Sequence, residues 1–145
     1  MDKFLFLDID GVLNNTNYHE SESDLSYPLS AFCKDNIKSF NKLMDEISDI
    51  KVVISSSWRV DSNLQNIFDK VGLNVKIFDI TPSLSDDRSV EIKEYLKDKT
   101  NYSYCIIDDI NYFNNDEQKD NFVLINDRIG FSDSDIDRVK KILEK

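Results

Sequence analysis

The chain is poor in the residues that mark several classes of protein. It has only 3 glycines and 2 prolines in 145 residues, which excludes a low-complexity or linker-rich protein. Its 2 cysteines, Cys33 and Cys105, lie in apolar patterns, so we interpret them as reduced core residues rather than a disulfide. The chain lacks any apolar run near the ~20 residues of a membrane span, and its start lacks the basic flank of a signal peptide. These features predict a cytoplasmic protein with one domain over residues 1–145.

Positive charge is also scarce. The 18 Lys and Arg residues are outnumbered by 28 Asp and Glu residues, which gives a net charge of -10. Such a charge repels polyanions, so a long nucleic acid held through many phosphates is disfavoured. A short or terminal phosphate is compatible with the charge, because a bound divalent cation can invert the local sign of a site.

Five short apolar runs predict strands, at residues 3–7, 51–54, 75–78, 104–107 and 122–125. Between them lie helical patterns: one over 31–48 with Ser30 as its N-cap, one capped by Asp61, one that starts near Asp87, and one from Ser132. Strands that are almost wholly apolar and alternate with helices predict an α/β fold with a parallel sheet covered on both faces. We therefore expect a three-layer α/β sandwich with five parallel strands, and no large cap domain fits between its elements.

Polar residues follow three of these strands where they end. The first run stops at Asp8-Ile9-Asp10-Gly11, the second at Ser55, and the fourth at Asp108-Asp109. Two other Asp-x-Asp matches occur, over 133–137, but only the first follows an apolar strand and precedes a glycine. Because ligands of open α/β sheets bind beyond the carboxyl ends of the strands, these side chains face a crevice.

Carboxylates gathered at one edge of a sheet require a cation. If the first and fourth strands are neighbours, Asp8, Asp10, Asp108 and Asp109 converge, and each like-charged pair at ~4 Å costs about 4 kcal/mol. An all-oxygen ligand set without His or Cys favours Mg²⁺. With this ion present, one carboxylate can attack phosphorus while a second exchanges a proton with the leaving group and then with water. Asp8 and Asp10 suit these two roles.

A bound phosphate also needs hydrogen-bond donors for its remaining oxygens. Ser55, the backbone amides beside it, and Arg88 at the start of a helix would supply them. Arg59, close to the serine run, is a second candidate cation. Two choices stay open here: the serine is Ser55 or Ser56, and the cation is Arg88 or, less favoured, Lys93.

These motifs resemble those of the haloacid dehalogenase (HAD) superfamily of phosphohydrolases. The superfamily's first motif resembles Asp8-Ile9-Asp10-Gly11-Val12-Leu13, its second the Ser that closes Val52-Val53-Ile54-Ser55, and its fourth Asp108-Asp109. The resemblance implies that Asp8 is the nucleophile and forms an aspartyl-phosphate. It implies that Asp10 is the general acid/base and also offers Mg²⁺ its backbone carbonyl, with Asp108 or Asp109 as further ligands. Among HAD proteins, the chain looks most like the small uncapped domains found with RNA-repair enzymes.

Several functions fit this pattern. We expect a Mg²⁺-dependent phosphatase, and a nucleic-acid 3′-phosphate end is the leading candidate substrate, with Trp58, Tyr18 and Tyr112 available to stack on a base. The alternatives are a small-molecule or nucleotide phosphatase, a phospho-accepting receiver-like domain, and an inactive phosphate-binding module. The sequence implies no membrane and no stable protein partner.

Overall fold

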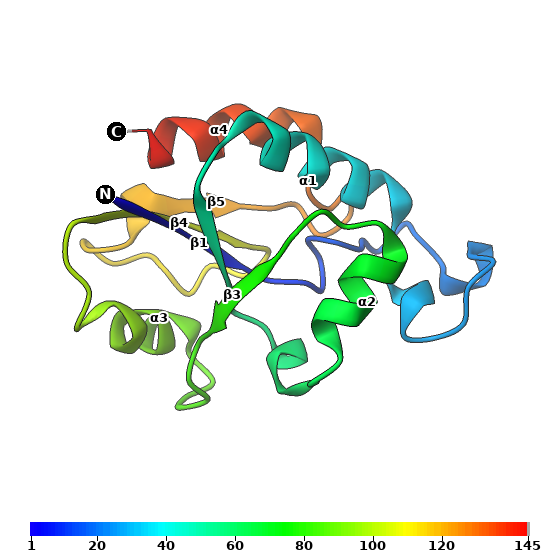
Figure 1. Ribbon diagram of the computed structural model, residues 1–145, viewed down its shortest axis with the longest axis horizontal. Helices are drawn as coiled ribbons and strands as arrows, with labels where there is room; N and C mark the ends of the chain where they lie inside the picture. Colours follow the sequence, from blue (N-terminus) through cyan, green and yellow to red (C-terminus); the bar gives the residue numbers. More distant parts are fainter. Residues whose placement is uncertain (145) are drawn as a thin grey trace.

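The computed structural model describes residues 1–144. They contain a five-stranded sheet whose neighbouring strands are all parallel (Figure 1). The strand order is β3-β2-β1-β4-β5. The strands are β1 (Asp2–Leu7), β2 (Ile50–Ile54), β3 (Ile77–Ile80), β4 (Tyr102–Asp108) and β5 (Phe122–Leu124). The predicted parallel α/β fold is confirmed, and the first strand lies at the centre of the sheet.

Alternating side chains of the central strands build two separate cores. In β1, Leu5 and Leu7 point to one core while Phe4 and Phe6 point to the other, as the two-residue period of a strand requires. Both cores are dry at their centres, since each of these four side chains is at most 2 % exposed. Burial on both faces explains why the strand sequences are apolar runs rather than alternating patterns.

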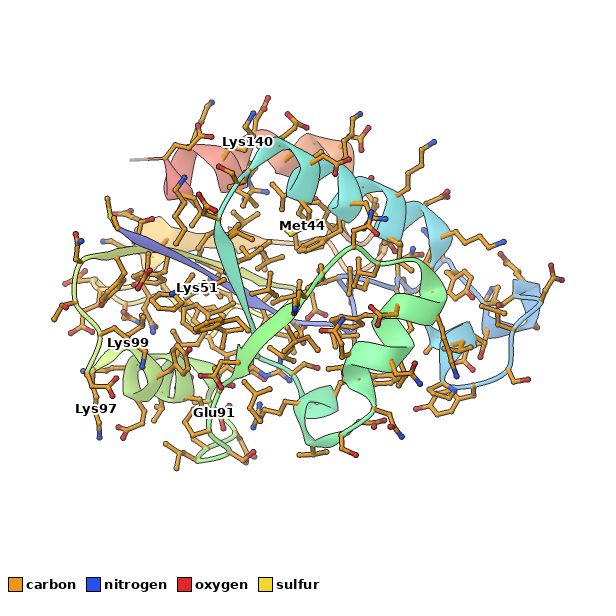
Figure 2. All side chains as sticks on the ribbon, in the orientation of Figure 1. Met44, Lys51, Glu91, Lys97, Lys99 and Lys140 are labelled. Carbon is orange, nitrogen blue, oxygen red and sulfur yellow. The ribbon has the colours of Figure 1, made fainter. Side chains whose placement is uncertain are left out.

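Four α-helices cover the two faces unequally. The larger core holds the apolar sides of α1 (Lys34–Glu46), α2 (Leu64–Val71) and α4 (Asp133–Leu143), and α1 and α4 lie side by side above the sheet in Figure 1. Figure 2 shows Met44 between α1 and the sheet, where it packs against this core. The smaller, aromatic core is covered by α3 (Arg88–Leu96) on the opposite face. The result is the expected three-layer sandwich, and no cap domain is inserted within residues 1–144.

The first predicted helix is wrong at its beginning. It starts at Lys34, with Cys33 as N-cap, and ends at Glu46, whereas Ser30 lies in the short 3₁₀ helix Leu29–Ala31. The cause is tertiary, because the amide of Cys33 donates to the carbonyl of Leu13 (3.0 Å) and Cys33 itself is extended. Because Cys33 is extended, the helix cannot include the residues before Lys34.

Other boundaries also differ from the prediction, and two of the differences have a visible cause. The third strand covers Ile77–Ile80 instead of 75–78, because the side chain of Gln65 binds both the carbonyl of Val75 and the amide of Ile77. The N-cap of α2 is Asn63, and Asp61 instead accepts a hydrogen bond from the amide of Asn63 in the turn before the helix.

Other local signals are confirmed. Asp87 is the N-cap of α3 and accepts from the amide of Ser89, and Ser132 and Asp135 form a capping box at α4. Cys33 and Cys105 are both buried and unpaired with each other. Within residues 1–144, every helix is too short or too polar to cross a membrane.

Candidate active site

The site is built where three adjacent strands end. Beyond β1 the amide of Asp8 still donates to Ile107 of β4 (3.1 Å), and beyond β2 the amide of Ser55 still donates to Leu7 of β1 (2.9 Å). Asp108 is the last residue of β4. The ladder of the sheet therefore fixes the backbones of Asp8, Ser55 and Asp108 next to one another at the carboxyl edge.

Three of the four predicted carboxylates converge at this edge. Asp8, Asp108 and Asp109 each place a carboxylate oxygen within 4.8 Å of the others. Asp8 is 3 % exposed and Asp108 is 1 % exposed, so two of the three are removed from water. Three acids in so small a volume repel one another strongly unless a cation joins them.

Gly11 makes this convergence possible. It adopts a left-handed conformation (φ 82°), and a Cβ atom built on it would lie 2.2 Å from a carboxylate oxygen of Asp109. The turn after Asp10 thus needs a residue without a side chain for two reasons, backbone conformation and the space that Asp109 occupies. The presence of Gly11 after Asp10 is thus explained by Asp109, a residue far along the chain.

Arg88 is the cation that reaches the carboxylates. Its Nη1 donates to Asp8 Oδ1 (2.6 Å) and to the carbonyl of Ser55 (2.7 Å), and lies 3.5 Å from Asp108 Oδ2. Asp87 caps α3 and so presents Arg88, the first residue of the helix, to the strand ends. The competing candidate, Lys93, lies on the surface beside Glu117 (3.7 Å). The geometry thus favours Arg88 over Lys93.

One guanidinium does not balance three acids. Burial, followed by the charge of Asp108, raises the pKa of Asp8, and the charge of Arg88 only partly opposes this. Burial likewise raises the pKa of Asp108, while the amide of Ile110 and the charge of Arg88 lower it. Arg88 contacts both carboxylates, yet the pKa of each remains raised. The charge of Arg88 alone therefore does not neutralise the acids of the site.

Two buried side-chain atoms at the site have no hydrogen-bond partner within residues 1–144. These are Asp108 Oδ2, a carboxylate oxygen of the cluster, and Ser55 Oγ. Buried polar atoms are rarely left unpaired unless something else binds them. Asp8, Asp108 and Asp109 offer only oxygen donors, which fits a hard cation such as Mg²⁺, and Ser55 Oγ can donate to an anion.

The two candidate serines are separated by their contacts. Ser56 Oγ accepts from the amide of Trp58 (3.2 Å) and so caps the 3₁₀ helix Ser57–Val60. Ser55 Oγ has no such partner. This difference favours Ser55 as the serine of the second motif, and Ser56 as the residue that shapes the loop after it.

Asp10 lies outside the three-carboxylate cluster. Its exposed side chain accepts from Trp58 Nε1 at 3.3 and 3.2 Å and from Asn14 Nδ2 at 3.1 Å. Asn14 also accepts from the amide of Gly11 (2.7 Å), which ties Asp10 to its own turn. The roles of Asn14 and Trp58 as partners of Asp10 were not foreseen, and only the proximity of Asn14 in the chain could have suggested one of them.

The remaining candidates lie around this centre. Arg59 pairs with Glu91 (3.0 Å) and donates to Ser83 Oγ and the carbonyl of Ser56, and within residues 1–144 it forms no hydrogen bond or ion pair with the carboxylate cluster. Tyr18 donates its hydroxyl to the carbonyl of Ser30 (2.7 Å), and Tyr112 packs against Phe113. The substrate contact predicted for Arg59 stays a prediction, and its ion pair with Glu91 argues against it.

A parallel sheet with acids after β1 and β4, a serine after β2 and a helix-borne arginine defines a HAD-type domain. The family model described as the HAD domain in Swiss Army Knife RNA repair proteins matches residues 4–136, and the chain belongs to this family. No curated protein and no solved structure matches the chain. The resemblance inferred from the motifs is thereby confirmed, and membership supports a phosphohydrolase-like enzyme with a possible metal site at the three aspartates.

Proposed function

We propose that this protein is a Mg²⁺-dependent phosphomonoester hydrolase that works through an aspartyl-phosphate on Asp8. The observation that supports this best is the set of three carboxylates, one arginine and one unpartnered serine hydroxyl at the ends of adjacent strands. An ion held by Asp8, Asp108 and Asp109, with the backbone carbonyl of Asp10, would supply positive charge that keeps these carboxyls ionised beside a phosphate.

The first half of the reaction transfers the phosphoryl group to the protein. A carboxylate oxygen of Asp8 forms a bond to phosphorus, and the bond from phosphorus to the leaving oxygen breaks. Asp10 donates its proton to that oxygen, so the product leaves as an alcohol. Arg88 holds the carboxylate of Asp8 in place, and Ser55 Oγ donates to a phosphate oxygen.

The second half returns the protein to its starting state. Asp10, now ionised, takes a proton from water, and the water oxygen forms a bond to phosphorus as the bond from phosphorus to Asp8 breaks. Inorganic phosphate is released and Asp10 is protonated again. The hydrogen bonds from Trp58 and Asn14 hold Asp10 on the solvent side of Asp8, where both the leaving group and water can reach it.

A nucleic-acid 3′-phosphate end is the substrate that we favour. The family is named after RNA repair proteins, and residues 1–144 contain no cap that could enclose a small metabolite. The net charge of -10 limits contacts with the backbone, so binding should depend little on length and only weakly on salt. Small-molecule or nucleotide hydrolysis is the second candidate, favoured by the same charge.

Two non-enzymatic alternatives are less well supported. A receiver domain has its phosphoacceptor after a middle strand of the sequence order, whereas here the spaced pair of acids follows the first strand. An inactive phosphate-binding protein would not need Asp10, yet this residue is present and held by two donors.

The first test is hydrolysis of p-nitrophenyl phosphate. We expect turnover with Mg²⁺, none with EDTA, and none in Asp8→Asn, because an amide cannot form the acyl phosphate. The control is Asp137→Asn, an exposed residue of α4 that belongs to another Asp-x-Asp sequence and should retain activity. Full activity of Asp8→Asn would refute the aspartyl-phosphate route.

The second test addresses the substrate. Release of phosphate should be compared between 3′-phosphorylated oligonucleotides, 5′-phosphorylated oligonucleotides and mononucleotides over a series of salt concentrations. A higher kcat/KM for the 3′-phosphorylated polymer with a shallow salt dependence supports the nucleic-acid end. A higher value for mononucleotides or sugar phosphates would instead identify a small-molecule phosphatase.

A further inference from the structure

Two neighbouring cavities lie beside the candidate acid/base Asp10, and we call the pair the groove. Its inner part is a cavity of about 380 Å³ whose lining includes Asp10, Glu20 and Ser57. Its outer part is a cavity of about 630 Å³, within the range of ligand sites. Both cavities are lined by Tyr27 and Trp58, so this aromatic pair borders each of them.

The outer part follows one face of α2. Asn63, Asn66, Ile67 and Lys70 line it, and their spacing of three, four and seven residues places them on a single helix face. From Asn63 to Lys70 the helix advances by roughly 10 Å. The opposite wall is the segment 26–29, which lies beside α2 (Figure 1). Asp10 thus lines the inner cavity and Lys70 lines the outer one.

The aromatic pair is preformed. Trp58 packs on the buried ring of Phe32 (centroids 5.4 Å apart), and its indole nitrogen is held by Asp10. Tyr27 lies 6.2 Å from Trp58, yet is 67 % exposed. An exposed tyrosine beside a fixed tryptophan offers flat apolar surface to a planar ring, and such surfaces bind nucleobases by stacking.

The polar lining suits a nucleotide better than an apolar ligand. Asn63 and Asn66 carry amides that can both donate to and accept from a base edge. The outer lining has one cation, Lys70, and one acid, Asp61, and within residues 1–144 Lys70 forms no ion pair with Asp61 or any other acid. A single lysine matches a single further phosphate, in agreement with the chain's large negative charge.

We infer that this groove binds the nucleoside that carries the phosphate to be removed, with its base at Tyr27 and Trp58 and the next phosphate at Lys70. The inference rests on the proposed function and makes it more specific. The minimal full substrate is then a dinucleotide with a terminal phosphate, and longer chains gain little because the groove provides no second cation. Tyr27, Trp58 and Lys70 determine specificity, whereas the chemistry belongs to the strand ends.

The kinetic test compares substrates with and without a ring. Wild type should prefer a 3′-phosphorylated dinucleotide to glycerol 2-phosphate, and Tyr27→Ala should reduce this preference about 10-fold, mostly through KM. Lys70→Ala should lower the preference for the dinucleotide over the mononucleotide about 2- to 5-fold, as expected for an exposed ion pair.

The controls are Phe78→Ala, an exposed aromatic on β3, and Lys38→Ala, an exposed lysine on α1, and both should keep these preferences. If Tyr27→Ala reduced both substrates equally, the inference would be overturned.

A binding test works without turnover. Trp58 is the only tryptophan of the chain, so its fluorescence reports directly on the groove. A 3′-phosphorylated dinucleotide should quench this fluorescence in Asp8→Asn, and the concentration needed should rise about 10-fold when Tyr27→Ala is added. Quenching by the dinucleotide, together with no hydrolysis of the dinucleotide or of p-nitrophenyl phosphate by wild type, would support the groove and refute the proposed function. Hydrolysis of the dinucleotide without quenching would support the proposed function and overturn the groove.

Discussion

Two arginines, Arg59 after the serine run and Arg88 after Asp87, both look like phosphate ligands in the sequence. Arg88 donates to Asp8 Oδ1 and lies 3.5 Å from Asp108 Oδ2, an oxygen that lacks a hydrogen bond. Arg59 contacts Glu91, whose carboxylate also accepts from the amides of Leu84 and Ser85. Around Arg88 the acids outnumber the cation, whereas Arg59 and Glu91 balance each other in charge and both make further hydrogen bonds.

This difference indicates that Arg88 belongs to a binding site, whereas Arg59 makes a structural contact. Arg59 joins the loop after β2 to α3 and to the segment 83–85. Its partner Glu91 is labelled in the lower part of Figure 2. An ion pair whose charges balance attracts a charged ligand only weakly. An incomplete one has binding capacity, and the cost of its burial is recovered when a ligand arrives.

The largest expected effect is the loss of turnover in Arg88→Ala. Removing a charged donor from the reacting carboxylate and the phosphate should lower kcat/KM roughly 10³-fold, as for other donors that stabilise developing charge. With Mg²⁺ present, the melting temperature should change little, because the ion still neutralises the acids. Steady-state kinetics and thermal melting measure the two quantities. Activity within 10-fold of wild type would place Arg88 with Arg59 among the structural residues.

Arg59→Ala should show the converse behaviour. It leaves Glu91, whose side chain is 1 % exposed, without its cation, and we expect unfolding to become easier by roughly 3 kcal/mol. The value lies at the lower end for buried pairs because two amides still bind Glu91. The turnover of the folded fraction should stay within 10-fold of wild type. Urea unfolding checks the first expectation, and Lys42→Ala, which breaks an exposed pair with Asp133, is the control that should barely shift the midpoint.

A metal should stabilise the Arg88 region in a manner that depends on pH. The folded-state pKa values of Asp8 and Asp108 lie above those of the unfolded chain, so their stabilising effect is present below about pH 4 and is lost as pH rises through the raised values. Mg²⁺ binds the ionised carboxylates, so it should stabilise most at pH 8 and little at pH 5. At a concentration 100 times its Kd the gain at pH 8 is about 2.7 kcal/mol.

Thermal melts at both pH values, with Mg²⁺ and with EDTA, test this expectation. Asp108→Asn should lose the stabilisation by Mg²⁺, whereas Asp137→Asn should keep it. An equal gain at pH 5 and pH 8, or an unchanged gain in Asp108→Asn, would remove the aspartates from the metal site.

The smallest effect is expected for Lys93→Ala. Lys93 was the weaker candidate for the site cation, and its Nζ lies 3.7 Å from Glu117 with both side chains more than two-thirds exposed. Such pairs contribute little to stability. Turnover and melting temperature should match wild type within error, and a 10-fold loss of kcat would show that a lysine, and not Arg88 alone, serves the phosphate.

The contrast between the two arginines also shows what the sequence could predict. The strand ends were predictable because an apolar run that stops at Asp8 or Asp108 is a local signal, and parallel strands bring such ends to one edge. The identity of the site cation was only partly predictable, since position at a helix start favoured Arg88 but could not reveal the partner of Arg59. That partner, Glu91, lies 32 residues away.

Other details depended equally on distant contacts. Asp10 lies outside the three-carboxylate cluster, and one of its two hydrogen-bond donors, Trp58, lies 48 residues later in the chain. The choice between Ser55 and Ser56 rests on which hydroxyl caps a turn, and adjacent serines have the same local propensity. The start of α1 and the shift of β3 were set by Leu13 and Gln65, neither of which belongs to the element it displaces.

The ladder bonds that extend past the strands also govern how the site can open. The amides of Asp8 and Ser55 donate to Ile107 and Leu7, so freeing either amide requires separating β1 from β4 or β2 at the centre of the sheet. Local fluctuations do not achieve this, and hydrogen exchange at both amides is expected to proceed only through global unfolding. The amide of Gly11, held by the side chain of Asn14 alone, can exchange through a much smaller opening. The backbone that carries Asp8, the proposed nucleophile, therefore keeps its hydrogen bonds as long as the native state itself lasts, and we expect any motion during a catalytic cycle in the loops around it.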